Sequence, residues 1–148
     1  MSYTWAGKRL GAAPNIVDDQ CHVLMVKHSY GKLNWEVPGR AVEVDESVCE
    51  ATTREVREGT GLHVRAEHLT GIYHMAENDS HHFVFLCKPV NLNQEPKPDL
   101  SEITECGYFQ PDALPRPMSD FTEGRIRDAL AGEALPLPIP VGPRQWLE

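Results

Sequence analysis

The arrangement of apolar and polar positions predicts strands in the first part of the chain. Apolar residues at 16–17 and 21–26 flank the polar residues 18–20, a pattern typical of a β-hairpin. A further apolar segment at residues 35–37 is followed directly by Pro38 and Gly39. Because proline and glycine interrupt regular structure, we expect a short strand there that ends in a turn.

The pattern becomes helical at Ser47. Glu50 follows three positions later, which is the spacing of a capping box, and Gly61 is a residue type that commonly ends helices. The residues between these signals suit a helix of about three turns. The sequence therefore predicts a helix over residues 47–60.

Three more strands are predicted in the second half of the chain. Residues 69–75 and 82–87 are apolar segments around the polar turn 77–80, which indicates a second pair of strands. A polar loop over residues 91–101 then leads to a short strand near residues 106–110.

A second helix is predicted after these strands. Ser119 is placed to cap it, and Gly132 lies just past its end. Its apolar side comprises Phe121, Ile126, Ala129 and Leu130. Strands and helices thus alternate along the chain, which indicates a layered α/β fold in a single domain over residues 1–132.

Residues 133–148 form a Pro-rich segment. Proline occupies every second position from Pro136 to Pro140, which excludes a regular helix and favours an extended, polyproline-like chain. The segment is apolar, so we expect it to pack on the body of the domain or on a second subunit of a homodimer, with Trp146 as an anchor.

Composition and charge argue against two kinds of binding partner, nucleic acids and anionic membranes. The chain has 148 residues and a net charge of −8, from 22 Asp and Glu against 14 Lys and Arg. Nucleic acids and anionic membranes are bound through clustered Lys and Arg, so we expect neither as a partner. A phosphate substrate held through a divalent cation is compatible with this charge. No apolar run approaches the roughly 18 residues needed to span a bilayer.

The cysteines bear on the compartment. Cys21, Cys49, Cys87 and Cys106 contain no Cys-x-x-Cys pair, which leaves zinc and thioredoxin-like chemistry unsupported. The first residues lack the apolar core of an export signal. We therefore expect free, mostly buried thiols in a cytoplasmic protein.

The candidate chemistry lies on the predicted helix over residues 47–60. Glu55 and Glu58 are three positions apart, so their carboxylates project from one face. Adjacent carboxylates repel each other and are best tolerated with a cation between them, and their oxygens suit Mg²⁺ or Mn²⁺. By themselves such pairs are more often a solvated surface. Glu46 and Arg54 are spaced for an ion pair that anchors the preceding loop.

The spacing around these glutamates resembles that of the Nudix hydrolase family. The family motif runs Gly, five residues, Glu, seven residues, Arg-Glu, an aliphatic residue, any residue, Glu-Glu, any residue, Gly and an aliphatic residue. Residues 40–62 match it in one register at Glu46, Arg54, Glu55, Val56, Glu58, Gly61 and Leu62. The resemblance implies an α/β/α sandwich with a mixed β-sheet between helices.

Two positions depart from the motif. Arg40 stands in place of the first glycine, and Gly59 replaces the second glutamate of the Glu-Glu pair, which is normally a metal ligand in the family. One negative charge is lost and one positive charge is gained, which should weaken divalent-cation binding. Arg40 either points to solvent or contacts a substrate phosphate directly through its guanidinium group.

The resemblance assigns roles to the remaining positions. It implies that Glu55 and Glu58 hold Mg²⁺ or Mn²⁺, with the backbone carbonyl of Gly39 and a further carboxylate ahead of a late strand. Glu102 lies at that place, and Glu105 is the neighbour with which it could be confused. Either Glu55 or Glu102 orients or deprotonates the attacking water.

The implied activity is hydrolysis of a diphosphate that links a nucleoside to another group X. Metal ions neutralise phosphate charge and lower the pKa of a bound water, and a carboxylate removes its proton. The alternative is a Nudix domain that binds a nucleotide as a regulatory module without turnover, with Gly59 marking the lost chemistry. In both cases the expected partner is a small nucleotide or diphosphate compound.

Overall fold

The computed structural model of the chain describes residues 6–132, 135 and 139–148, without the side chains of Arg40, Ile139 and Pro140. In chain order the elements are β1 (Arg9–Ile16), β2 (Val23–His28), β3 (Trp35–Glu36), β4 (Arg40–Ala41), α1 (Val48–Thr60), β5 (Val64–Met75), the 3₁₀ turn η1 (Ala76–Asn78), β6 (Ser80–Pro89), β7 (Ile103–Phe109), β8 (Met118–Ser119), α2 (Asp120–Ala131), β9 (Ile139–Val141) and β10 (Trp146–Leu147).

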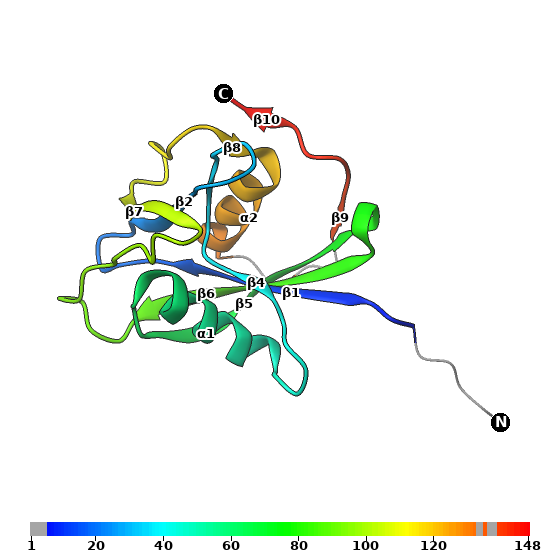
Figure 1. Cartoon of the computed structure of the whole chain (residues 1–148), viewed down its shortest axis with the longest axis horizontal. Helices are drawn as coiled ribbons and strands as arrows, with labels where there is room; N and C mark the ends of the chain where they lie inside the picture. Colours follow the sequence, from blue (N-terminus) through cyan, green and yellow to red (C-terminus); the bar gives the residue numbers. More distant parts are fainter. Residues whose placement is uncertain (1–5, 133–134, 136–138) are drawn as a thin grey trace.

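The strands form two mixed sheets. The first has the order β4-β1-β6-β5-β9 and the second the order β10-β8-β3-β2-β7. Parallel pairs join β1 to β6 and β3 to β8, whereas β5 with β6 and β2 with β7 are antiparallel. Helices α1 and α2 lie on opposite sides of the first sheet (Figure 1). The predicted α/β fold with mixed strand pairing is confirmed, and the mixed pairing is distributed over two sheets.

The hairpin predicted around residues 18–20 is wrong as a sheet element. The turn forms, because the Asp18 carboxylate accepts hydrogen bonds from the amides of Gln20 and His22 at 2.9 and 2.8 Å. Beyond a single antiparallel bridge between Val17 and Val23, however, the two strands separate into different sheets. Each has a longer partner elsewhere, β6 for β1 and β7 for β2, and these long-range ladders outweigh the local pairing.

The other predicted elements are confirmed, with shifted ends. The paired strands around residues 77–80 extend over β5 and β6, and the late strand β7 begins at Ile103. Ser119 caps α2, because its hydroxyl accepts a hydrogen bond from the Thr122 amide at 3.1 Å. Gly132 ends the helix in the left-handed conformation. The prediction for Leu130 is wrong, since its side chain is 37% exposed.

The core fills the space around both sheets. One buried cluster joins Met25 and Trp35 of the second sheet to Ile126 of α2. Another joins Ile16 and Leu24 to Val56 of α1. Because each helix buries one side against the strands, the opposite side of α1 is left for charged residues.

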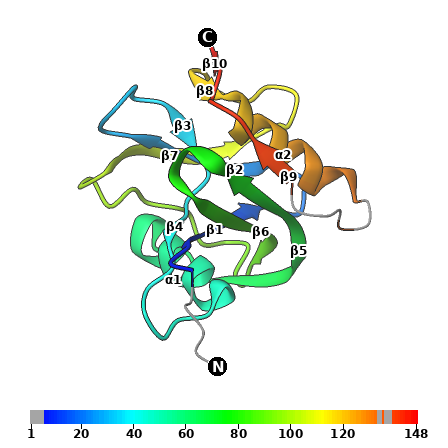
Figure 2. The same cartoon turned by 90° about the vertical axis from the view of Figure 1, so that its right-hand side faces the viewer.

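The C-terminal segment touches both sheets. Strand β9 pairs in parallel with β5 of the first sheet, and β10 pairs antiparallel with β8 of the second. The tail runs from one to the other beside α2 (Figure 2). The Trp146 ring lies under the Lys32 ammonium, 5.1 Å from the ring centroid. The predicted polyproline-like run includes residues 136–138, which lie outside the described residues.

The four thiols are free, as predicted, but the expectation that most are buried is wrong. Cys87 is buried, Cys106 is half-buried, and Cys21 and Cys49 are exposed. Cys21 occupies the turn at residues 18–21, with a positive φ of 62°, and Cys49 lies in the first turn of α1. No helix among the described residues has the length and apolar character needed to cross a membrane.

Candidate active site

Helix α1 carries the paired glutamates on its outer side. The Ser47 hydroxyl accepts a hydrogen bond from the Glu50 amide at 3.0 Å, and the Glu50 carboxylate accepts one from the Ser47 amide at 3.3 Å. At the other end Gly61 adopts φ 76° and closes the helix. The predicted capping box and glycine stop are thus confirmed. The helix between these two ends buries Val56 against the core and turns Glu55 and Glu58 toward the cavity described below.

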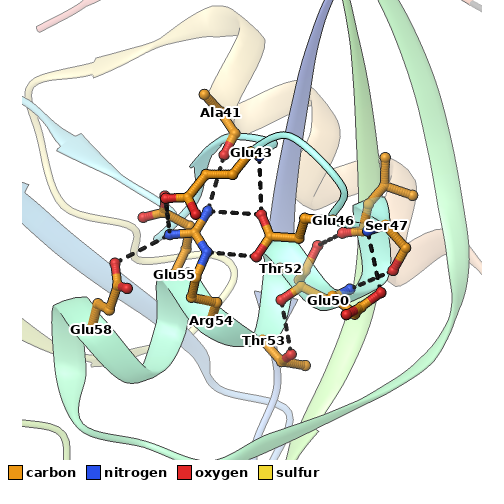
Figure 3. Close-up of polar contacts among 11 residues, drawn as sticks. Ala41, Glu43, Glu46, Ser47, Glu50, Thr52, Thr53, Arg54, Glu55 and Glu58 are labelled. Atoms are coloured by element: carbon orange, nitrogen blue, oxygen red, sulfur yellow. Dashed lines mark hydrogen bonds and ion pairs between the residues drawn. The ribbon is translucent and has the colours of Figure 1, made fainter.

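The predicted ion pair between Glu46 and Arg54 is confirmed. The Arg54 guanidinium donates to the two Glu46 oxygens at 2.6 and 3.0 Å and to the Ala41 carbonyl at 3.2 Å (Figure 3). The hydrogen bond to Glu46 holds the pKa of Arg54 above its usual value and that of Glu46 below it. The pair ties the loop before α1 to the body of the helix.

Arg54 also lies between the paired glutamates. Its Nη1 atom is 3.2 Å from a carboxylate oxygen of Glu55, 3.2 Å from one of Glu58 and 3.5 Å from one of Glu43. Figure 3 shows these side chains converging on the guanidinium from α1 and from the loop. One guanidinium therefore faces four carboxylates, which it cannot neutralise by itself.

Gly39 brings the loop close to the first sheet. Its φ is 144°, and a Cβ atom there would lie 2.6 Å from the Ala12 carbonyl oxygen. Both the conformation and the contact require glycine. The following residue, Arg40, forms β4 through its backbone opposite Ala12. The prediction that Arg40 contacts a phosphate concerns its side chain, which lies outside the described part of the structure.

The loop before β7 places Glu102 near α1. The Glu102 carbonyl accepts from the Ser29 amide at 2.9 Å, and Asp99 accepts from the Ser101 and Glu102 amides at 3.1 and 3.4 Å. The Asp99 amide in turn donates to the Gly59 carbonyl at 3.2 Å. The loop is thus held on the last turn of α1.

One cavity of about 400 Å³ brings these groups together. Its lining includes Gly39, Glu55, Glu58 and Glu102. The cavity is also lined by Tyr30, His28, Asp99 and Gly59. Glu105 is not among its lining residues and instead faces Lys27, 3.7 Å away.

Sequence reasoning missed Asp99 and His28. Asp99 binds the amides two and three positions ahead, and this turn is signalled by aspartate before serine in a polar loop. Burial raises the pKa of Asp99, but the Ser101 hydroxyl and the amides of this turn outweigh it, so the pKa lies below its usual value. His28 stacks on Tyr30 with ring centroids 4.7 Å apart, and no sequence signal pointed to it.

The donor set suits a hard divalent cation. Carboxylates and a backbone carbonyl are the ligand types of Mg²⁺ and Mn²⁺, and the cavity lining supplies both. In the described part of the chain no three His, Cys, Asp or Glu side chains are yet close enough to hold a metal. The Glu58 side chain is 59% exposed, and its carboxylate is paired with Arg54 at 3.2 Å.

Comparison with known proteins agrees with this geometry. The NUDIX domain matches residues 8–130. A MutT-like protein of Streptomyces ambofaciens is 35% identical over 98 residues, which cover 66% of this chain and 62% of that protein. The match therefore spans less than two thirds of the relative.

Solved structures share the fold. A NUDIX hydrolase from Nitrosomonas europaea is 27% identical, with a TM-score of 0.70 over 88% of this chain and 94% of the other. An ADP-ribose pyrophosphatase from Streptococcus suis is 24% identical, with a TM-score of 0.70 over 88% of this chain and 97% of the other. With the domain match covering most of its length and these structures superposing on it, the chain belongs to the Nudix hydrolase family.

Proposed function

We propose that the protein is a divalent-metal-dependent hydrolase that cleaves a diphosphate linkage in a nucleoside diphosphate joined to a group X. The observation that carries this proposal is the convergence of Glu55, Glu58 and Glu102 on one cavity with Gly39 at its edge. These residues come from α1 and from the loops before β4 and β7, which are far apart in sequence.

Residues of this chain would supply both the metal ligands and the general base. Glu55, Glu58, Glu102 and the Gly39 carbonyl would hold Mg²⁺ or Mn²⁺, which when bound neutralises phosphate charge and acidifies water. The resemblance to the family leaves Glu55 and Glu102 as the two candidates for the base, and both line the cavity. A base must lie within hydrogen-bond reach of the proton that it removes.

Arg54 is a positioning residue in this scheme. Its contacts with Glu46 are shorter than those with Glu55 and Glu58. A divalent cation can replace the longer contacts while the Glu46 pair keeps the loop in place. The Arg54 side chain therefore balances Glu55 and Glu58 until metal binds.

The test is hydrolysis of a compound panel in Mg²⁺ and, separately, in Mn²⁺. Nucleoside triphosphates, nucleotide sugars and dinucleoside polyphosphates belong in the panel, and ADP-ribose is included because a pyrophosphatase for it shares the fold. Glu58→Gln and Glu102→Gln should each lower kcat/KM by at least about 100-fold, since each removes a charged ligand or the base. Calorimetric titration with Mn²⁺ should show weaker binding in both variants.

Glu105→Gln is the matched control, since Glu105 lies three positions further along the chain, on β7, and outside the cavity. It should keep the activity of the native chain. Nucleotide binding without turnover in either metal would reject the proposal and favour the regulatory module. Equal losses in Glu102→Gln and Glu105→Gln would reject the assignment of Glu102.

A further inference from the structure

A second cavity adjoins the carboxylate-lined one. It has a volume of about 290 Å³ and lies at β1, β3 and α2. The two cavities share three lining residues, His28, Gly39 and Ala41. A ligand that is anchored at the glutamates can therefore extend past Gly39 into this second space.

Arginines from three separate segments line the second cavity. Arg9 comes from β1, Arg125 from α2 and Arg144 from the C-terminal tail. The acidic residue in the lining is Glu36, whose carboxylate is already bound by Arg125 and accepts from the Thr122 hydroxyl at 2.8 Å. Positive charge thus exceeds negative charge around this cavity.

Arg9 and Arg144 are the arginines left for a ligand. Within residues 6–132, 135 and 139–148 neither forms an ion pair with a carboxylate. Arg144 instead lies over the Phe121 ring, 5.5 Å from its centroid, and its Nη2 atom is 3.8 Å from the Met75 sulfur. These contacts orient the guanidinium but leave its charge uncompensated.

The cavity lining adds a neutral hydrogen-bonding group. Burial and the neighbouring Arg125 and Arg144 guanidinium groups lower the pKa of His82 to about 4. His82 is therefore uncharged at neutral pH, and its ring is 3.0 Å from the Ser80 hydroxyl. Burial is the larger cause of this shift, and the two arginines add to it.

Arg144 is held by its own segment. The next residue, Gln145, forms two hydrogen bonds with Asp120 at the start of α2. Its amide donates to the Asp120 carboxylate at 3.0 Å, and its carbonyl accepts from the Asp120 amide at 2.9 Å. Strands β9 and β10 fix the segment on both sides. The NUDIX match covers residues 8–130, so Arg144 lies outside the matched region.

We propose that the second cavity binds the end of the substrate remote from the cleaved linkage, and that Arg9 and Arg144 select substrates carrying an anionic group, phosphate or carboxylate, at that end. The proposal rests on the proposed function for the place of the diphosphate. Guanidinium groups bind both anions through charge-assisted hydrogen bonds.

The test is equilibrium binding of two matched pairs of compounds. ADP-ribose and its 2′-phosphate differ by a phosphate, and UDP-glucose and UDP-glucuronate differ by a carboxylate. Calorimetry is done with Glu58→Gln in Mg²⁺, and chromatography afterwards shows whether the ligand is intact. In at least one pair the charged member should bind about tenfold more tightly, a typical gain for a charged hydrogen bond.

Adding Arg144→Gln or Arg9→Gln should reduce that preference to about threefold or less in the same pair. Arg65→Gln is the matched control, because Arg65 is an exposed arginine that lines neither cavity. The pair that responds shows which anion the cavity accepts and on which side of the diphosphate, since the 2′-phosphate is on the nucleoside and the glucuronate carboxylate is on the group X. No preference in either pair, or a preference that survives both substitutions, would overturn the proposal.

The outcome is independent of turnover. Charge preference that depends on Arg144, in a native chain that hydrolyses none of the compounds, would support the anion cavity and reject the proposed hydrolase. Metal-dependent hydrolysis with equal affinity for both members of each pair would support the proposed hydrolase and reject the anion cavity.

Discussion

Gly59 lies in the last turn of α1 and lines the cavity with Glu55 and Glu58. A Cβ atom there would lie 3.1 Å from Cδ1 of Ile103. This contact is with the end of a side chain, which can move by a few tenths of an ångström. Glycine at position 59 is therefore not required by the backbone, unlike Gly39, and a longer side chain can be accommodated.

Gly59→Glu should strengthen metal binding. The new carboxylate would lie four positions after Glu55, on the same side of the helix. We expect the Mg²⁺ concentration that gives half-maximal activity to be about tenfold lower than in the native chain, because metal affinity rises with the number of charged ligands. Gly59→Ala adds the Cβ atom without the carboxylate and should leave the metal requirement unchanged. If alanine and glutamate act alike, the effect comes from helix stability and not from charge.

Helix α1 organises the site as an element. Its N-terminus is fixed by the capping box and its middle by Arg54, which reaches back to Glu46 and Ala41. The Glu43 amide also donates to the Glu46 carboxylate at 3.0 Å. Loop and helix are therefore tied together by hydrogen bonds, and the position of the loop backbone that lines the cavity depends on the helix.

Ser47→Ala should destabilise the fold by about 1 kcal/mol, because the first turn loses the acceptor for the Glu50 amide. For a domain of this size that corresponds to a drop in Tm of about 2–4 °C, measurable by thermal denaturation followed by circular dichroism. Ser47→Asp keeps an acceptor at the cap and should remain close to the native Tm. A similar drop in both variants would show that the cap hydrogen bond is not the cause.

The two sheets are joined across the whole molecule by buried polar contacts. Glu36 of the second sheet pairs with Arg125 of α2, whose carbonyl accepts from Asn15 of the first sheet at 3.4 Å. Burial raises the pKa of Glu36, but the Arg125 charge, the Thr122 hydroxyl and the Val37 amide outweigh it, so the pKa lies below its usual value. The contribution of Glu36 to stability is lost as pH falls below about 4.5.

As the pH is lowered, the stability loss caused by His82 should begin at a higher pH than the loss caused by Glu36. The unfolded chain takes up a proton at His82 near pH 6.5, and the folded chain near pH 4. Between these values the unfolded state binds more protons, so stability falls as pH drops, by at most about 1.4 kcal/mol per pH unit. Urea denaturation between pH 7 and 4.5 should show a shallower pH slope in His82→Gln.

His63→Gln is the comparison for this experiment, since His63 is exposed and lies outside both cavities. It should retain the native slope. A native slope in His82→Gln would assign the acid sensitivity to other groups.

Much of the fold and part of the site could be predicted from local patterns. The capping box, Gly61 and the spacing of Glu46 and Arg54 each act within a few residues, and the structure confirms them. The hairpin at residues 18–20 failed because the partners of β1 and β2 lie far along the chain. Leu130 and two of the thiols, Cys21 and Cys49, were predicted to be buried and are exposed, because burial depends on what packs over a residue, which a local pattern does not encode.

Neighbouring residues in the chain thus specified the helices, their caps and the face that carries Glu55 and Glu58, since these depend on short-range hydrogen bonds and helical spacing. Long-range packing decided the rest. It separated the strands into two sheets, placed Asp99 against the last turn of α1 and Glu102 in the same cavity as Glu55, and brought Arg144 of the tail to the cavity that Arg9 also lines. Such contacts join residues tens of positions apart, and their energies become defined when the sheets pair and the core closes.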